Sequence, residues 1–182
     1  MFILASQSPR RKEILEMLGV DFTIIPAKNE AEIPSNMPIK YGVTQVAYLK
    51  AREVFHLHPE STVLGADTVV VIGNEILGKP KDKQEAYSML KKLSGKTHQV
   101  MTGVALIKKG KTVMFSEQAR VTFASLTDEE INDYIETGEP FDKAGSYAVQ
   151  GKSAKFVKKI DGDYYAVVGL PCQKLYQALK NF

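Results

Sequence analysis

The segment Ser6–Arg11 brings two hydroxyl groups and two guanidinium groups to the expected start of a helix. Ser8 is a favoured N-cap residue, and Pro9 suits the first helical position because an N–H group there would have no intrahelical partner. The first turn of a helix favours acidic side chains, yet this one holds Arg10 and Arg11. The arrangement becomes favourable when a phosphate binds to the free N–H groups, hydroxyls and guanidinium groups together. The alternative is a solvated arginine pair on a surface helix.

A single carboxylate, Asp67, interrupts the apolar run Val63–Ile72. A strand of this composition is normally buried on both faces, and an unpaired buried carboxylate costs several kcal/mol. Asp67 is therefore expected to have a cationic partner, to bind a metal, or to serve as a general base. Thr68 follows it and points to the opposite face of the strand. The alternative is a carboxylate near solvent at a strand end.

Two glycine-containing segments carry further candidates. Lys79 lies between Gly78 and Pro80, on a rigid turn that could hold an ammonium group against a phosphate oxygen. The loop from Gly138 to Gly151 contains Lys143 and Gln150, and an amide with an acceptor and two donors suits the edge of a nucleobase. The alternatives are a solubilising lysine and a plain connecting loop.

Two other charged residues are weaker candidates. Glu30 lies in the polar loop Ala27–Pro38, where a carboxylate near a phosphate site could hold Mg²⁺. Glu32 is its near rival, and the sequence does not separate the two. Lys50 lies in the middle of an expected helix, where a lysine is most often a solvated surface residue.

The composition excludes several classes of protein. The chain has 182 residues, a net charge of +3 and one cysteine, which excludes an internal disulfide framework and a cysteine-based zinc cluster. The charge balance is too mild to predict a nucleic-acid partner, and no apolar run is long enough for a membrane span. A lone thiol and the lack of a signal-peptide pattern favour the cytoplasm.

Alternating strand-like and helix-like segments predict an α/β or α+β fold in one domain, which could have two lobes. Helix-start patterns at Asp82 with Glu85, and at Thr127 with Glu130, are typical of capping boxes. The expected helices cover residues 9–18, 43–55, 83–93, 128–137 and 171–180. The expected strands cover residues 2–5, 22–26, 62–72, 75–77, 98–108 and 112–123, followed by a last hairpin of residues 155–160 with 164–168.

Six motifs in this order resemble the Maf family of nucleoside triphosphate pyrophosphatases over nearly the whole chain. They are LASQSPRR (4–11), LGADTVV (64–70), LGKP (77–80), LSGKTHQVMTGVAL (93–106), GEPFDKAGSYAVQG (138–151) and VVGLP (167–171). The resemblance implies a fold like that of inosine triphosphate pyrophosphatases, a long mixed β-sheet with helices in two lobes around a central cleft.

The resemblance also implies an activity, the hydrolysis of a nucleoside triphosphate to the monophosphate and pyrophosphate with Mg²⁺ or Mn²⁺. The pattern DKAG at 142–145 with Gln150 is similar to the branch that acts on dTTP and UTP. The branch that acts on 7-methyl-GTP carries Glu in place of that Gln. A homodimer is compatible with the family.

The family's functional positions fall on the residues already singled out. The resemblance makes Asp67 the proton acceptor and makes Arg11, Thr68 and Gln150 the specificity positions. It adds phosphate-handling and acidic positions at Ser8, Arg10, Glu30, Lys50 and Lys79. Of these, Lys79, Glu30 and Lys50 are expected to be catalytic residues together with Asp67. Lys143 is taken as a further substrate-binding residue, and Glu30 and Asp67 as the expected metal ligands.

The sequence leaves three alternative functions open. The protein could be a nucleotide-binding regulator of cell division without turnover. It could bind nucleic acid through its arginines and lysines, against the charge balance. It could also be a house-cleaning enzyme for a modified or noncanonical nucleotide.

Overall fold

The computed structural model describes residues 1–29 and 31–182, so Glu30 and its predicted role lie outside the described residues. The chain forms two compact units. Unit 1 contains residues 1–68, 102–117 and 169–182, and unit 2 contains residues 69–101 and 118–168. Most of the residues expected to hold phosphates belong to unit 1, whereas Lys79, Lys143 and Gln150 belong to unit 2.

A mixed β-sheet of seven strands runs through the described part of the chain in the order β2-β1-β3-β5-β6-β7, with β4 paired to β3. Strand β1 pairs in parallel with β2 and β3, whereas β4 and β7 are antiparallel to their neighbours. The predicted α/β class with a long mixed sheet is confirmed. The strands are β1 (Phe2–Leu4), β2 (Thr23–Ile24), β3 (Thr62–Ile72), β4 (Glu75–Leu77), β5 (Thr97–Lys108), β6 (Lys111–Phe123) and β7 (Val157–Gly162).

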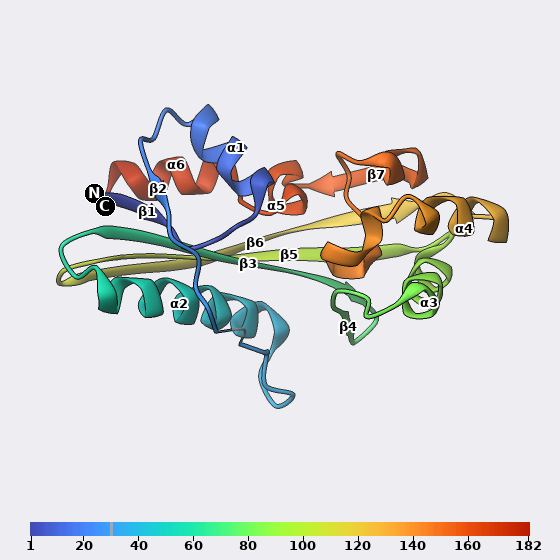
Figure 1. Cartoon of the computed structure of the whole chain (residues 1–182), viewed down its shortest axis with the longest axis horizontal. Helices are drawn as coiled ribbons and strands as arrows, with labels where there is room; N and C mark the ends of the chain where they lie inside the picture. The colour runs from blue at the N-terminus through green and yellow to red at the C-terminus, as the bar shows by residue number, and fades with distance from the viewer. Residues whose placement is uncertain (30) are drawn as a thin grey trace. The chain divides into compact units, whose positions relative to one another are not determined.

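In unit 1, helices cover both faces of the sheet. Figure 1 shows α2 (Ile39–Leu57) on one face of the strands, and α1 (Pro9–Met17) and α6 (Cys172–Lys180) on the other. Helix α2 buries Val43, Ala47, Ala51 and Val54, which recur at helical spacing, and the last three belong to the apolar core of unit 1. Leu49, also on α2, is 39% exposed and does not belong to this buried set.

Two glycines let α2 approach the sheet closely. A Cβ atom on Gly65 in β3 would lie 2.3 Å from the carbonyl oxygen of Ala47, and one on Gly103 in β5 would lie 2.5 Å from that of Val43. Both obstacles are helix backbone, which cannot move aside as a flexible side chain could. The glycines therefore bring the backbone of α2 almost into contact with β3 and β5.

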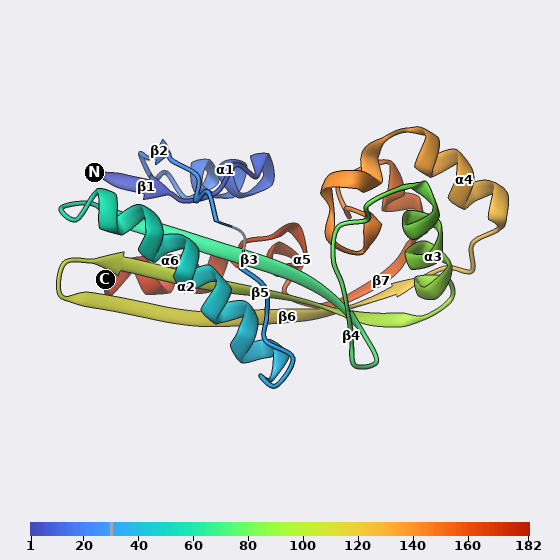
Figure 2. The same ribbon diagram turned by 60° about the horizontal axis from the view of Figure 1, so that its bottom comes forward.

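Unit 2 packs helices α3 (Lys83–Leu93) and α4 (Asp128–Glu136) beside each other, as Figure 2 shows. The capping box predicted at Thr127 and Glu130 is confirmed. At α3 the Asp82 side chain accepts from Glu85 N, but the Glu85 carboxylate accepts from Lys81 N, so the predicted box is only half formed. Short 3₁₀ turns follow α4 at Glu139–Asp142, Ala144–Ser146 and Lys152–Phe156.

The predicted last hairpin is wrong. Residues Tyr164–Val168 form helix α5, and β7 pairs with β6 instead. The carboxylate of Asp163 accepts from the N–H groups of Tyr165 and Ala166, which satisfies donors at the start of the helix. These two local hydrogen bonds outweigh the strand preference of the aromatic and β-branched residues. Within the described ranges, no helix is both long enough and apolar enough to cross a membrane.

The core of unit 2 contains a histidine. His98 is 2% exposed, and its Nε2 atom lies 2.7 Å from the hydroxyl oxygen of Tyr147. The imidazole stands edge-on to the rings of Phe123 and Tyr147, and its Nδ1 atom has no hydrogen-bond partner among the described residues. Burial lowers the pKa of His98 from 6.5 to about 4, so the ring is neutral near pH 7.

This buried histidine predicts an acid-sensitive stability. Because the folded pKa lies below the unfolded one, the stabilisation is complete above about pH 6.5 and is lost as the pH falls towards 4. At pH 5 the loss should be about 2 kcal/mol relative to pH 7, measured by urea unfolding. The variant His98→Gln should lose this part of the pH dependence, whereas His56→Gln, at an exposed position, should keep it. Equal pH dependence in His98→Gln and the parent protein would contradict the assignment.

Candidate functional site

The central contact of unit 1 is an ion pair between α2 and β3. Lys50 Nζ lies 2.6 Å from Asp67 Oδ1, and the two side chains are only 23% and 19% exposed. Of the three possibilities that the sequence left open for Asp67, the structure shows a cationic partner. The ammonium group compensates the charge of a carboxylate that would otherwise be costly to shield from water.

The local sequence explains how this pair forms. Gly65 and Asp67 are two residues apart in β3, so both face α2. Lys50 follows Ala47 by three residues and therefore lies on the sheet-facing side of the helix. The close approach at Gly65 brings the Lys50 stem within reach of the carboxylate. Lys50 is thus a paired lysine rather than the solvated one that its position in the helix first indicated.

The opposite face of β3 holds the second polar cluster. The guanidinium group of Arg11 donates to Gly169 O (2.9 Å), Ser6 Oγ (3.0 Å) and Thr68 Oγ1 (3.1 Å). The hydroxyl oxygens of Thr68 and Thr102 are 2.8 Å apart. Burial lowers the pKa of Arg11, and the charge of Asp67 raises it in part. Arginine stays protonated in proteins, so the fork is a fixed positive charge beside Asp67.

The two arginines of the first helix have different surroundings. Arg11 is held by three segments of unit 1, whereas the half-buried Arg10 side chain makes no hydrogen bond or ion pair with any described residue. Ser8 occupies the N-cap position of α1, but its hydroxyl makes no capping bond. The first N–H groups of a helix have no intrahelical partner. Arg10, the Ser8 hydroxyl and these N–H groups can therefore bind an anion without breaking a contact.

The remaining predicted residues lie in unit 2. Lys79 is exposed on the turn after β4, and Gly78 O accepts from Gly145 N at 3.0 Å, which fixes this turn to the loop after α4. In that loop the Lys143 ammonium donates to Glu139 O and Asp142 Oδ1, and Gln150 is exposed.

Ser6 supplies one of the two hydroxyls expected to face a phosphate, and in the structure it accepts from Arg11. Two other contributors to the Arg11 cluster were not predicted, namely Thr102 and Gly169. The sequence offered a signal for Thr102, a polar residue within the long apolar segment of β5. For Gly169 the decisive feature is its backbone, since φ is +127° and its carbonyl faces Arg11 Nε.

The donor set fits a divalent cation that also takes phosphate oxygens. Asp67 Oδ1 is held by Lys50, while Oδ2 makes no hydrogen bond with the residues described in the structure. Those residues contain no group of three or more His, Cys, Asp and Glu side chains able to hold a metal by themselves. One carboxylate completed by substrate phosphates is a normal way for a protein to bind Mg²⁺.

The fold and the family follow from comparison with other proteins. A solved HAM1 protein from Coxiella burnetii has a TM-score of 0.56 and 15% identity, and the match covers 100% of this chain and 98% of that one. This likeness places the chain in the same class of mixed α/β folds.

The family is shown by sequence. The family model described as Maf-like protein matches residues 1–182, and the chain belongs to this family. Relatives named dTTP/UTP pyrophosphatase are 55% identical in Bacillus cytotoxicus, covering 100% of this chain and 95% of the relative. Others from Bacillus pumilus and Bacillus anthracis are each 53% identical, covering 99% of this chain and 95% and 94% of the relatives.

The Arg11 cluster predicts a stability effect that needs no substrate. Arg11→Lys keeps the charge but cannot reach three acceptors in fork geometry, so Gly169 O and Thr68 Oγ1 lose charged donors. We expect a loss of about 2–4 kcal/mol in the free energy of unfolding, measured with urea. Arg10→Lys, the matched control, should change it by less than about 0.5 kcal/mol. Similar values for the two variants would show that the fork is not structural.

Proposed function

We propose that this protein hydrolyses dTTP and UTP to the nucleoside monophosphate and pyrophosphate. The observation that carries the proposal is the Lys50–Asp67 pair on one face of β3 with the cationic Arg11 cluster on the other. Asp67 and Thr68 are consecutive residues, and the charge of Asp67 acts on Arg11, which supports a role for both groups in binding one substrate. The names of relatives above 50% identity over the full chain support the same activity.

In the proposed reaction, Asp67 accepts a proton from the water that attacks the α-phosphorus. A bond forms between the water oxygen and this phosphorus, and the bond from the α-phosphorus to the α–β bridging oxygen breaks. Pyrophosphate then leaves with the bridging oxygen. Lys50 holds Oδ1 and so fixes the orientation of the carboxylate that accepts the proton.

The start of α1 supplies groups that can bind the charged phosphates. The Ser8 hydroxyl, the Arg10 guanidinium group and the first N–H groups of the helix are donors towards phosphate oxygens. Arg11 adds positive charge while keeping its protein partners. Lys79 belongs to the same proposed set and would bind charge that develops on the leaving pyrophosphate.

The proposed cofactor is Mg²⁺ or Mn²⁺. When bound, it neutralises charge on the phosphate oxygens and polarises the bond to the phosphorus. Asp67 would hold it together with those oxygens, and Glu30 is the second proposed ligand. The expected cytoplasmic location and homodimer stay predictions.

Base recognition is assigned to Gln150. Its amide can accept from N3–H of uracil or thymine and donate to a neighbouring carbonyl of the base. A glutamate would place a carboxylate oxygen against that carbonyl, and the two sets of lone pairs repel each other. Lys143 is retained as a substrate-binding residue of the same loop.

The role of Asp67 is tested by Asp67→Asn, which keeps the shape and removes the proton acceptor. Pyrophosphate release from dTTP with Mg²⁺ should fall about 10²-fold or more. Asp128→Asn is the control, since Asp128 also pairs with a lysine but is 64% exposed in unit 2. Near-normal turnover of Asp67→Asn would remove this residue from the role. A parent protein that binds dTTP without turnover would instead favour the regulatory alternative.

The role of Gln150 is tested by Gln150→Glu across dTTP, UTP, 5-methyl-UTP, CTP and 7-methyl-GTP. We expect kcat/KM for dTTP and UTP to fall about 10-fold or more relative to 7-methyl-GTP, because a hydrogen bond to the base becomes a repulsion. Gln177→Glu on α6 makes the same change at an exposed position and should leave the profile unaltered. An unchanged profile in Gln150→Glu would refute the assignment. A parent preference for a modified nucleotide would favour the house-cleaning alternative.

A further inference from the structure

We propose that Glu139 is a positioning residue, which fixes the loop 139–153 and thereby the orientation of Gln150 towards the base. This inference rests on the proposed function. It concerns a residue of unit 2 that none of the predicted roles includes. The base-reading loop consists of residues 139–153, starts shortly after the end of α4 at Glu136 and lies entirely within unit 2.

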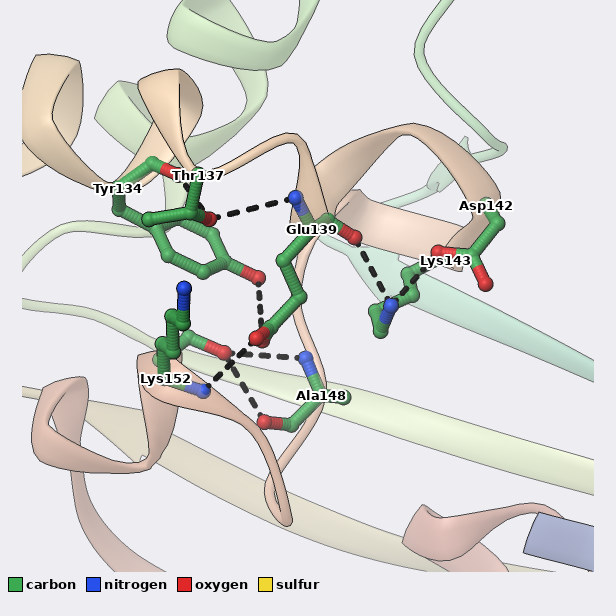
Figure 3. Close-up of polar contacts among 8 residues, drawn as sticks. Tyr134, Thr137, Glu139, Asp142, Lys143, Ala148 and Lys152 are labelled. Atoms are coloured by element: carbon green, nitrogen blue, oxygen red, sulfur yellow. Dashed lines mark hydrogen bonds and ion pairs between the residues drawn. The ribbon is translucent and has the colours of Figure 1, made fainter. Parts of the chain in front are cut away.

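The Glu139 carboxylate joins the two ends of the base-reading loop. Its Oε1 atom accepts from the Tyr134 hydroxyl at 3.1 Å, and Oε2 accepts from Lys152 N at 3.0 Å. Figure 3 shows the carboxylate between these two donors. Burial and the charge of Glu139 raise the pKa of Tyr134, which keeps its hydroxyl a donor. Tyr134 is 2% exposed, so the carboxylate is anchored to the core of unit 2.

The Glu139 carboxylate occupies the space beside the Cα atom of Gly151. A Cβ atom on Gly151 would lie 2.0 Å from Glu139 Oε1. The glycine φ of −107° is open to other residues, so backbone conformation does not require glycine here. Any side chain at this position must push the carboxylate away from Tyr134 and Lys152. Gly151 and Glu139 are therefore matched to each other.

Gln150 itself sits in a turn whose ends are fixed. Gly151 N donates to Ala148 O at 3.0 Å, and the buried Ser153 hydroxyl bonds both Ala148 N and Ala148 O. The Gln150 side chain is exposed between these anchors. The Glu139 carboxylate connects this turn to Tyr134 of α4 through Lys152 N, and the ring of Tyr134 also packs against Phe156 at the far end of the segment. Loss of the Glu139–Lys152 contact would loosen the turn next to Gln150 while its far end stays packed.

The backbone of Glu139 serves the other proposed substrate-binding residue. Its carbonyl oxygen accepts from Lys143 Nζ at 2.8 Å, and this side chain is only 11% exposed. In Figure 3 the Lys143 ammonium lies between Glu139 O and the Asp142 carboxylate. One residue thus contacts the segments that carry both Lys143 and Gln150. A shift of Glu139 would therefore disturb both of these segments.

A purely structural role would lower stability and affect all substrates equally. A positioning role predicts a different result, a loss of discrimination between bases. Glu139→Ala removes both acceptors, and Glu139→Gln is the milder variant that keeps one oxygen acceptor. Gly151→Ala breaks the same contact from the other side. Glu136→Gln is the matched control, because Glu136 is also on this stretch of chain but makes an exposed ion pair with Lys83.

The experiment measures kcat and KM for UTP and CTP, with thermal unfolding to verify folding. In Glu139→Ala and Gly151→Ala we expect KM for UTP to rise about 10-fold or more and the UTP-to-CTP ratio of kcat/KM to fall by a similar factor. Glu139→Gln should shift both values in the same direction by less. Glu136→Gln should match the parent. Amide hydrogen exchange should show faster exchange at Lys152 in the Glu139 variants and in Gly151→Ala, but not in Glu136→Gln.

An unchanged UTP-to-CTP ratio in folded Glu139→Gln and Gly151→Ala would overturn the inference, whatever happens to kcat. Faster exchange at Lys152 with an unchanged ratio would overturn it too, because the loop would then move without affecting recognition. If Glu139→Ala fails to fold, the other two variants decide. A parent protein without pyrophosphate release from UTP would refute the proposed function first, and this inference with it.

Discussion

The ion pair between Lys50 and Asp67 is the contact on which the candidate site depends. A carboxylate within a buried strand is costly unless a cation reaches it, and here the cation comes from a neighbouring helix. That helix must lie against the sheet at the distance a lysine stem can span. Gly65 and Gly103 allow this, since a methyl group at either would collide with the backbone of α2.

Because side chains alternate along β3, the two faces of this strand contact different residues. Asp67 faces α2 and its lysine, while Thr68 faces the side where Arg11 lies. Arg11 then connects the segment after β1, the strand β3 and the turn at Gly169. In the proposed function, the proton acceptor and an anion-binding residue are therefore neighbours in the sequence. Lys50 and Arg11 lie on opposite faces of β3 and do not compete for the Asp67 carboxylate.

In unit 2, an irregular loop carries the exposed polar side chain of Gln150. Loops have few repeating backbone hydrogen bonds, so side chains must supply the constraints. The Ser153 hydroxyl closes the turn around Gln150, and the Glu139 carboxylate ties that turn to the core through Tyr134. The absence of a side chain at Gly151 is part of the same arrangement.

The sequence alone determined the features that depend on neighbours within a few residues. Capping residues, apolar periodicity and turn residues predicted most helices and strands, and the anomalies at Arg10, Arg11 and Asp67 marked the candidate site. The tertiary structure decided which residues that are distant in the sequence contact each other. Lys50 and Asp67 are 17 positions apart, and Arg11 and Gly169 are 158 apart. Helix α5 also escaped prediction, because two hydrogen bonds accepted by Asp163 outweighed the strand preference of its residues. Local propensity is worth only tenths of a kcal/mol per residue, whereas compensating a buried charge is worth several, and only the folded chain brings the compensating group into reach.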